Sequence, residues 1–305
     1  MYKSDPARGA AWRKRFAEEA ADIPFHIWPD VGDPAAVEYL VAWQPPDDLF
    51  QRFPNLRIVF SIGAGVDQFS LEEFPPAVKL ARMLDPGITQ GMVEYVTMAT
   101  LALHRDLPAY LCAQRERRWR ALPSKPAHER TVGIMGLGNL GRAVTAQLRG
   151  LGFAVRGWSR SAHEIEGVRC YAGHVGLQKF LAGCDILVCM LPLTAATTGI
   201  LCSKTFALLP PGATLVAAGR GGHLVEEELL SALADGQLAA AVIDVLSDEP
   251  PPPTHPFWDH PQIMLTPHIA ATTQVDTGCS ALLDNIRRHQ SGQPILGEVN
   301  RLSGY

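Results

Sequence analysis

Three polar side chains in the second half of the chain could together assist the reduction of a carbonyl group by a hydride donor. Arg220 lies in the glycine-rich stretch 218–222, Glu249 precedes a run of prolines, and His268 follows Pro267. A guanidinium can bind a carboxylate or polarise a carbonyl oxygen, and an imidazole can donate a proton to that oxygen. A carboxylate beside the imidazole fixes its tautomer and favours its protonated form. We therefore predict Arg220, Glu249 and His268 as catalytic residues, and expect the glycines beside Arg220 to leave room for a small ligand.

Each of these residues has a simpler explanation when taken alone. An isolated arginine commonly forms a surface salt bridge, and an isolated histidine is more often structural than catalytic. A serine-hydrolase site is excluded because the sequence has no nucleophile elbow. A metal site is excluded because the His, Cys and acidic residues lack ligand spacing. The prediction therefore depends on the three residues occurring as a set, without a metal ion.

A glycine-rich motif upstream predicts a bound dinucleotide. It follows the apolar run 131–135 and opens a helical pattern over 139–151. In this setting the first glycine permits a tight turn, the second lets the backbone approach the pyrophosphate, and the third lets the helix pack on the sheet. The alternative is a glycine turn with a purely structural role. The residues predicted to contact the cofactor here are Gly136, Gly138, Asn139, Leu140 and Gly141.

The next predicted strand ends in Ser159, Arg160 and Ser161, which favours the phosphorylated cofactor. NAD sites of this type place an Asp or Glu about 20 residues past the glycines, on the ribose 2′-OH. Here the first acid is Glu164. A guanidinium flanked by two hydroxyls suits a 2′-phosphate, so we predict NADPH rather than NADH. Arg160 as an ordinary exposed arginine is the alternative.

Strand-like and helix-like segments alternate from Glu129 onward, which predicts a parallel sheet covered on both faces. The predicted strands are 131–135, 153–158, 185–191, 213–217, 239–245 and 263–265, and the predicted helices are 139–151, 175–181, 203–209 and 225–234. Arg220 follows one of these strands and His268 another. Both therefore lie at the carboxyl ends of parallel strands, where open α/β sheets bind ligands.

The first part of the chain is less regular and predicts a second, smaller domain. Strand-like runs at 37–43, 56–61 and 78–82 precede a long helical stretch at 92–107, and a last helix is expected at 281–290. We predict an α/β protein with two Rossmann-like domains and doubly wound parallel sheets. The substrate domain would comprise residues 1–97 and 283–305, and the dinucleotide domain residues 98–282 would be inserted into it.

Composition narrows the class of protein. The formal net charge is −4, so the chain has no electrostatic footprint for nucleic acid. Residues 1–16 are polar and basic without the apolar segment of a signal peptide, and no run of about 20 apolar residues could span a membrane. Six cysteines without CxxC spacing indicate reduced thiols. We expect a cytoplasmic protein that binds neither nucleic acid nor membrane.

A second glycine-rich loop lies in the predicted substrate domain, at residues 61–67. Its backbone N–H groups could form an anion nest for a carboxylate. A structural turn is the alternative.

Taken together, these motifs resemble the D-2-hydroxyacid dehydrogenase family, and within it the branch that reduces glyoxylate and hydroxypyruvate. The resemblance covers nearly the whole chain and rests on residues 42–46, 63–67, 157–160, 220–221, 244–245, 249–250, 266–268 and 304–305. It implies that Arg220 binds the carboxylate and carbonyl oxygen, that His268 is the acid/base, and that Glu249 is its partner. One departure is Ala217, where the family usually has Asn.

The resemblance also implies further contacts. Those to the cofactor would come from Leu191, Pro192, Ala218, Arg220, Asp244, His268 and Ala270, and those to the substrate from Trp43, Ala64, Gly65, Trp119, Arg220 and His268. The family is typically dimeric, with an arm that reaches the other subunit, and Trp119 matches an arm tryptophan that closes the pocket. We therefore expect a homodimer.

The resulting hypothesis is an NADPH-dependent reductase of small 2-oxo acids, glyoxylate and hydroxypyruvate first, working between the two domains. A rival within the same class is an NAD-dependent dehydrogenase of a larger 2-hydroxy acid. A rival of another class is a protein that senses NADPH and binds a partner without turnover, because fold does not fix function.

Overall fold

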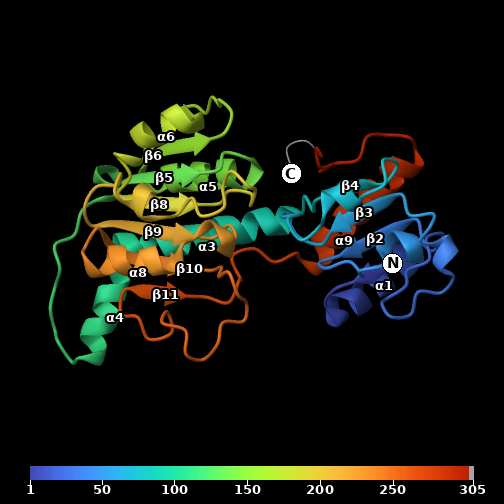
Figure 1. The fold of residues 1–305 in the computed structure, drawn as a ribbon, viewed down its shortest axis with the longest axis horizontal. Helices are drawn as coiled ribbons and strands as arrows, with labels where there is room; N and C mark the ends of the chain where they lie inside the picture. Colours follow the sequence, from blue (N-terminus) through green and yellow to red (C-terminus); the bar gives the residue numbers. More distant parts are fainter. Residues whose placement is uncertain (302–305) are drawn as a thin grey trace. The chain divides into compact units, whose positions relative to one another are not determined.

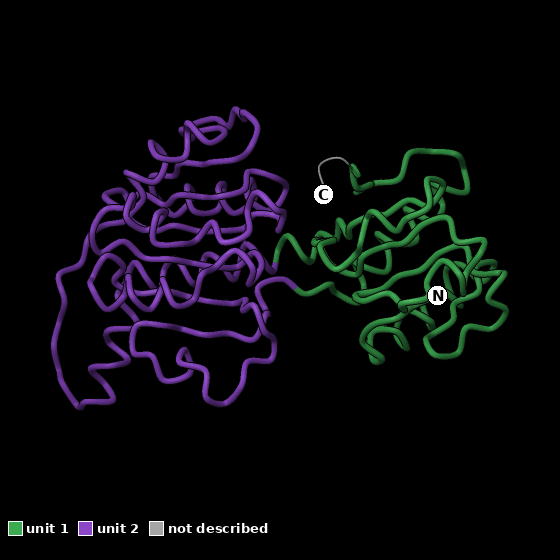
Figure 2. Tube along the Cα trace, in the orientation of Figure 1, with its two compact units in different colours: residues 1–90, 272–305 green, residues 91–271 purple. Residues whose placement is uncertain are grey.

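The computed structural model describes residues 1–301 and divides the chain into two compact units (Figures 1 and 2). Unit 1 comprises residues 1–90 and 272–305, and unit 2 comprises residues 91–271. The first predicted boundary, like the one in the structure, falls inside helix α3 (Pro86–His104). The second falls inside helix α9 (Val275–Gln290), all of which belongs to unit 1. The motif at 304–305 lies outside the described residues.

The sheet of unit 2 has seven strands, all parallel to their neighbours. They are β5 (Thr131–Met135), β6 (Ala154–Ser159), β7 (Arg169–Ala172), β8 (Ile186–Cys189), β9 (Ala213–Ala217), β10 (Leu238–Ile243) and β11 (Ile263–Leu265). Their order is β11-β10-β9-β8-β5-β6-β7, so β6 and β7 are added on one side of β5 and the later strands on the other, beginning with β8. This topological switch point is where doubly wound sheets bind ligands. The predicted α/β fold class is confirmed.

Helices cover both faces of this sheet, because alternate side chains of each strand enter opposite cores. Val132, Ile134 and Val188 pack with residues of α3 and of α5 (Asn139–Gly150). Met135 and Leu187 face the other core, which is built with helices α6 (Gly173–Leu181), α7 (Ser203–Phe206) and α8 (Glu226–Ala234). Helix α4 (Leu107–Arg115) follows α3. Helix α3 ends before Pro108, as predicted, but already at His104, and Pro108 lies in the first turn of α4.

Unit 1 contains a four-stranded parallel sheet in the order β1-β2-β3-β4. Its strands are β1 (Tyr2–Lys3), β2 (Tyr39–Ala42), β3 (Ile58–Ser61) and β4 (Lys79–Ala81), and its helices are α1 (Pro6–Glu19), α2 (Leu49–Arg52) and α9. Helix α1 occupies residues that the sequence suggested only as polar and basic. Asp5 caps it by accepting the N–H of Arg8 at 2.7 Å, and its Trp12 and Phe16 are buried. The Trp12 indole N–H also donates to the Val275 carbonyl at 2.8 Å, which joins α1 to α9.

Candidate active site

The glycine-rich loop connects β5 to α5 at the switch point and has the geometry of a phosphate cradle. Gly136 has a φ of 104°, in the region that favours glycine. A Cβ on Gly141 would lie 1.8 Å from the Gly136 carbonyl oxygen, so only glycine fits where the helix begins. A Cβ on Gly138 would meet no atom within 4 Å. The open space beside Gly138 lies at the amino end of α5, where backbone N–H groups favour an anion.

Arg160 lies at the carboxyl end of β6, next to the strand that carries the loop. Its side chain and that of Ser161 are exposed, whereas Ser159 is buried and its hydroxyl donates to the Ser161 carbonyl at 2.7 Å. The Ser159 hydroxyl therefore orders the backbone here, and Arg160 and Ser161 are the groups at the surface. The fit of this edge to a 2′-phosphate rests on these two side chains.

A second arginine, which the sequence reasoning missed, lies beside the same loop. Arg142 is in the first turn of α5; its Nε donates to the Leu137 carbonyl at 3.2 Å, and its Nη2 lies 2.9 Å from Nδ1 of His163. Arg142 thus ties the glycine-rich loop to the segment after Arg160. Its position directly after Gly141 was the available signal.

His268 and Glu249 form a direct pair in unit 2. Nδ1 of His268 lies 2.7 Å from Oε2 of Glu249, and both side chains are about one-third exposed. His268 has a φ of 53°, which is uncommon for a residue other than glycine. Its backbone N–H donates to the carbonyl of Asp244 at 2.8 Å. The pair leaves Nε2 as the ring atom that can exchange a proton with a ligand.

The turn that carries His268 is held by a buried carboxylate. Asp244 accepts hydrogen bonds from the Thr266 hydroxyl at 2.7 Å, from the N–H of Ile269 at 2.9 Å and from the N–H of Ala270 at 2.8 Å. Tyr95 lies 2.6 Å from the Thr266 hydroxyl, and burial raises the pKa of Tyr95, which keeps it a donor. Asp244 therefore shapes the 266–270 turn from inside, and its proposed contact with the cofactor remains a prediction.

The Arg220 turn packs directly on the loop that carries Glu249. A Cβ on Gly221 would lie 1.9 Å from the carbonyl carbon and oxygen of Leu246, so glycine is required by this close backbone approach. Gly221 thus has a packing role of its own, and the expectation that the glycines beside Arg220 leave room for a small ligand stays a prediction. The N–H of Leu246 in turn donates to Oε1 of Glu249 at 2.8 Å. Backbone packing thus links Arg220 and Glu249, while the Glu249 carboxylate links to His268.

The remaining predicted cofactor residues of unit 2 line the same edge of the sheet. Leu191 and Pro192 follow β8, and Ala218 follows β9 and donates its N–H to the Cys189 carbonyl at 3.1 Å. Leu191, Ala218 and Ala270 are buried, so their backbone atoms are what they can offer a ligand.

Comparison with known proteins agrees with this architecture. A family model described as "D-isomer specific 2-hydroxyacid dehydrogenase, NAD binding domain" matches residues 97–270. Glyoxylate/hydroxypyruvate reductase A of Serratia proteamaculans is 41% identical over 300 residues, which cover 96% of each chain. The chain belongs to the D-isomer specific 2-hydroxyacid dehydrogenase family.

Solved structures of the 2-hydroxyacid dehydrogenase family share the fold over nearly the full length. One from Xanthobacter autotrophicus Py2, in complex with NADPH and MES, has a TM-score of 0.94 at 37% identity and covers 100% of this chain and 98% of the other. The NADPH-dependent glyoxylate/hydroxypyruvate reductase of Sinorhizobium meliloti, in complex with NADP and sulfate, has a TM-score of 0.89 at 36% identity, covering 100% and 99%.

The substrate contacts predicted for this dehydrogenase in unit 1 follow β2 and β3. Trp43 comes directly after β2, and its ring lies 3.1 Å from where a Cβ on Gly63 would be. Ser61 is fully buried; its hydroxyl donates to the Gly65 carbonyl at 2.7 Å and accepts the N–H of Gly63 at 3.3 Å. This internal network fixes the loop that contains Ala64. Contacts of Trp43, Ala64 and Gly65 with a carboxylate remain predictions.

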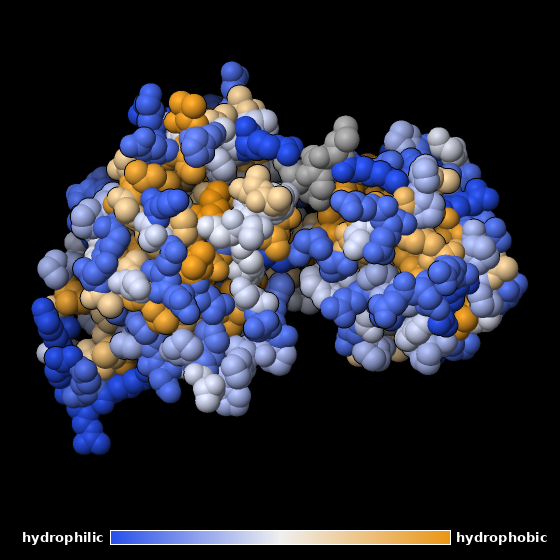
Figure 3. All heavy atoms as spheres, viewed as in Figure 1, coloured by the Kyte–Doolittle hydropathy of each residue, from blue (hydrophilic) through white to orange (hydrophobic). Residues whose placement is uncertain are grey.

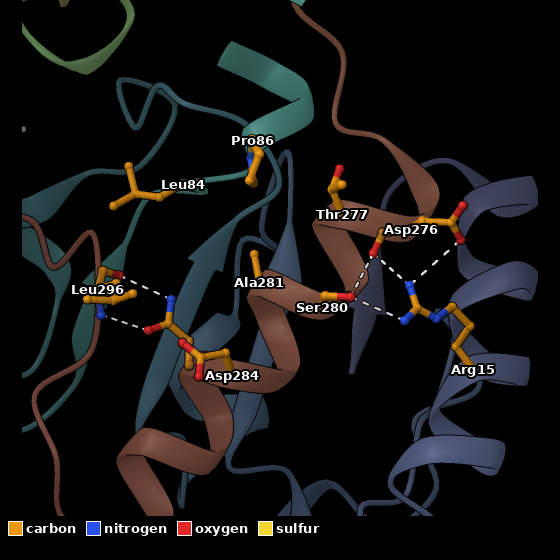
Figure 4. A pocket seen from close by; sticks show the side chains of 10 residues that line it. Arg15, Leu84, Pro86, Asp276, Thr277, Ser280, Ala281, Asp284 and Leu296 are labelled. Atoms are coloured by element: carbon orange, nitrogen blue, oxygen red, sulfur yellow. Dashed lines mark hydrogen bonds and ion pairs between the residues drawn. The ribbon is translucent and has the colours of Figure 1, made fainter. Parts of the chain in front are cut away.

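Two other features of this dehydrogenase are an exposed tryptophan and a pocket in unit 1. Trp119 is fully exposed, in a segment without helix or strand after α4. A pocket of about 450 Å³ in unit 1 contains none of the predicted site residues (Figure 4). It is lined by Arg15, Leu84, Pro86, Asp276, Thr277, Ser280, Ala281, Asp284, Asn285 and Leu296. Arg15 there is held by Glu19, by the Asp276 carbonyl and by Ser280, so it serves to join α1 to α9.

Residues 1–301 contain no group of three or more His, Cys, Asp and Glu side chains that could hold a metal ion. Over the same part of the chain, no helix is long and apolar enough to cross a membrane.

Proposed function

We propose that this dehydrogenase reduces small 2-oxo acids with NADPH, and that glyoxylate and hydroxypyruvate are its first substrates. The observation that carries the proposal is the Glu249–His268 pair, since the loop that carries Glu249 packs against the Arg220 turn at the carboxyl edge of a dinucleotide-type sheet. The similarity to the Serratia and Sinorhizobium reductases, both named for these two acids, supports the choice of substrate.

Each residue then has a separate task. NADPH, when bound, supplies the hydride that adds to the carbonyl carbon. The fork of Arg220 binds the carboxylate and polarises the carbonyl oxygen. Protonated His268 donates from Nε2 to that oxygen, while Glu249 holds the ring through Nδ1 and stabilises its positive charge.

The preference for NADPH rests on this chain's own residues. Gly136, Gly138 and Gly141 form the cradle, with open space beside Gly138 for a pyrophosphate. Arg160 and Ser161 are exposed at the position where an NAD site would have an acid, and they suit a 2′-phosphate.

We also propose a homodimer as the working form. Helices α3 and α4 expose apolar side chains, including Met98, Leu101, Leu107, Tyr110 and Leu111. The segment that follows α4, at the lower left of Figure 3, is rich in charged side chains, and its Trp119 is fully exposed. A second copy of the chain would bury these apolar side chains. Trp119 would then reach that copy and close its substrate pocket. In light scattering, Leu111→Arg should give monomers, whereas Val175→Arg on α6 should stay dimeric.

We also propose a cytoplasmic location, on the basis of the thiols. Cys112, Cys170, Cys184, Cys189, Cys202 and Cys279 are all free, which supports a reducing, cytoplasmic location.

The deciding experiment measures NADPH oxidation with glyoxylate, hydroxypyruvate, pyruvate and no acid, and repeats each with NADH. Fast turnover of the first two, with NADPH preferred, is the expected result. Turnover of pyruvate with NADH, without turnover of glyoxylate or hydroxypyruvate, would favour the larger-acid dehydrogenase instead. Tight NADPH binding without turnover of any acid would favour the sensing protein.

A further inference from the structure

His223 lies directly behind the Arg220 turn, with only 1% of its surface exposed. The backbone N–H of Arg220 donates to its Nδ1 at 3.1 Å, and its Nε2 lies 3.2 Å from the carbonyl oxygen of Pro192. A backbone N–H can only donate and a carbonyl can only accept. The imidazole is therefore neutral, with its proton on Nε2, and it contacts a different loop with each nitrogen.

Both loops belong to the proposed site. Pro192 follows β8 in the segment predicted to contact the cofactor, and Arg220 follows β9 and is proposed to bind the acid. The Pro192 carbonyl also accepts the Thr197 hydroxyl at 2.7 Å. The ring of His223 is packed tightly, because a Cβ on Gly219 would lie only 3.0 Å from Nδ1.

We propose that His223 is a positioning residue that links the cofactor loop at Pro192 to the substrate-binding turn at Arg220. The inference rests on the proposed function, which assigns the cofactor to one loop and the acid to the other. Nδ1 sets the backbone of Arg220 and so aims its guanidinium. Nε2, together with Thr197, sets the carbonyl of Pro192.

Two substitutions test the contacts of Nδ1 and Nε2 separately. In His223→Asn, the amide oxygen takes the place of Nδ1 and can still accept the Arg220 N–H, but nothing reaches Pro192. In His223→Gln, the terminal amide reaches the place of Nε2 and can still donate to Pro192, but the acceptor for Arg220 is lost. A merely structural role would not distinguish these variants.

The measurements are the KM for glyoxylate and the Kd for NADPH, the latter from the fluorescence of the bound cofactor without any acid. We expect His223→Asn to weaken NADPH about three- to tenfold while leaving the KM for glyoxylate nearly unchanged. His223→Gln should raise the KM for glyoxylate by a similar factor and leave NADPH binding nearly unchanged. Thr197→Val should reproduce the effect of His223→Asn on NADPH.

The matched control is His128→Asn, in a short helix (Ala127–Glu129) just before the amino end of β5. The loops at Pro192 and Arg220 lie at the opposite, carboxyl end of the strands. It should change neither constant. Equal changes in both constants for the Asn and Gln variants, or no change in either, would overturn the proposal. If neither His223 variant folds, Thr197→Val tests the proposal. A Thr197→Val protein that binds NADPH as tightly as wild type would overturn the link through Pro192.

Failure of the proposed function would look different. A wild-type protein that turns over no 2-oxo acid loses its substrate assignment, yet the NADPH titrations of His223→Asn and Thr197→Val still test the Pro192 link. Binding of oxamate, a non-reducible analogue, to the NADPH-loaded protein then tests the Arg220 link: weaker binding to His223→Gln alone supports it, and equal binding overturns it.

Discussion

The carboxylate of Glu249 divides its two oxygen atoms between His268 and the backbone of its own loop. Oε2 lies 2.7 Å from Nδ1 of His268, and Oε1 accepts the N–H of Leu246 at 2.8 Å. Both contacts bring a donor to Glu249, so the position needs two acceptor atoms. A carboxylate provides them and an amide does not.

Glu249→Gln should therefore disturb catalysis although the side chain keeps its shape. One of the two donors, Leu246 N–H or His268 Nδ1–H, must face an NH₂ group, and the ring loses its charge partner. We expect kcat to fall about 10²-fold, and His268→Ala to lower it about 10²- to 10⁴-fold, with NADPH binding retained in both. Steady-state kinetics and fluorescence titration measure this, with Glu72→Gln in unit 1 as the control. Near-normal turnover of His268→Ala would remove His268 from the mechanism.

Arg160→Ala should discriminate between the two forms of the cofactor. Loss of charge-assisted hydrogen bonds to a 2′-phosphate should raise the KM for NADPH about ten- to a hundredfold and leave the KM for NADH nearly unchanged. The comparison is made in the glyoxylate assay, with Arg13→Ala on α1 as a matched exposed arginine. Equal losses for NADPH and NADH would contradict the assignment of Arg160 to the phosphate.

Gly221→Ala should uncouple the Arg220 turn from the Glu249 loop. The new Cβ would meet the Leu246 backbone at 1.9 Å, which cannot move without shifting Glu249. Overpacking of this kind costs about 1–3 kcal/mol of stability, and kcat should fall with it. The control is Gly150→Ala at the end of α5, where a Cβ meets no atom within 4 Å. Urea unfolding should show Gly150→Ala to be at least as stable as wild type, and unchanged kcat in Gly221→Ala would refute the coupling.

His104 should make the stability of unit 2 depend on pH. Burial, then the charges of Arg130 and Arg105, hold the pKa of His104 below its usual value, while Asp106 opposes them; Nδ1 has no hydrogen-bond partner among the described residues. A lowered folded pKa means that the unfolded chain takes up the proton first as pH falls. The neutral ring of His104 therefore makes its full contribution to the free energy of unfolding above about pH 6.5. This contribution is lost as the pH falls through the folded-state pKa.

The test is urea unfolding between about pH 7.5 and 5.5, in wild type and in His104→Phe. Phenylalanine keeps the edge-on contact with Phe153, whose ring centre lies 5.0 Å away. The wild-type midpoint should fall more steeply toward acid pH than that of the variant. Parallel curves for the two proteins would show that His104 does not contribute.

Local patterns predicted most of unit 2 because its elements are short and continuous in sequence. Val132, Ile134 and Val188 enter one core while Met135 and Leu187 enter the other, so each strand is apolar along its whole length and visible without the fold. Strand β7 was missed, since its four residues are partly exposed and carry no such run. Helix α1 was missed because Trp12 and Phe16 are its only large apolar residues, and α9, which α1 packs against, is more than 250 residues away.

The sequence by itself predicted the residue types of the site: the glycines of the 136–141 motif, an arginine where an NAD site has an acid, and the set Arg220, Glu249 and His268. The tertiary structure alone decided which loop meets which. Gly221 meets Leu246, and His223 meets Pro192, between segments about 25 to 30 residues apart. Such contacts produce no periodic pattern in the sequence, because residue types reflect local conformation and burial. Which loops come into contact depends instead on how the strands pair.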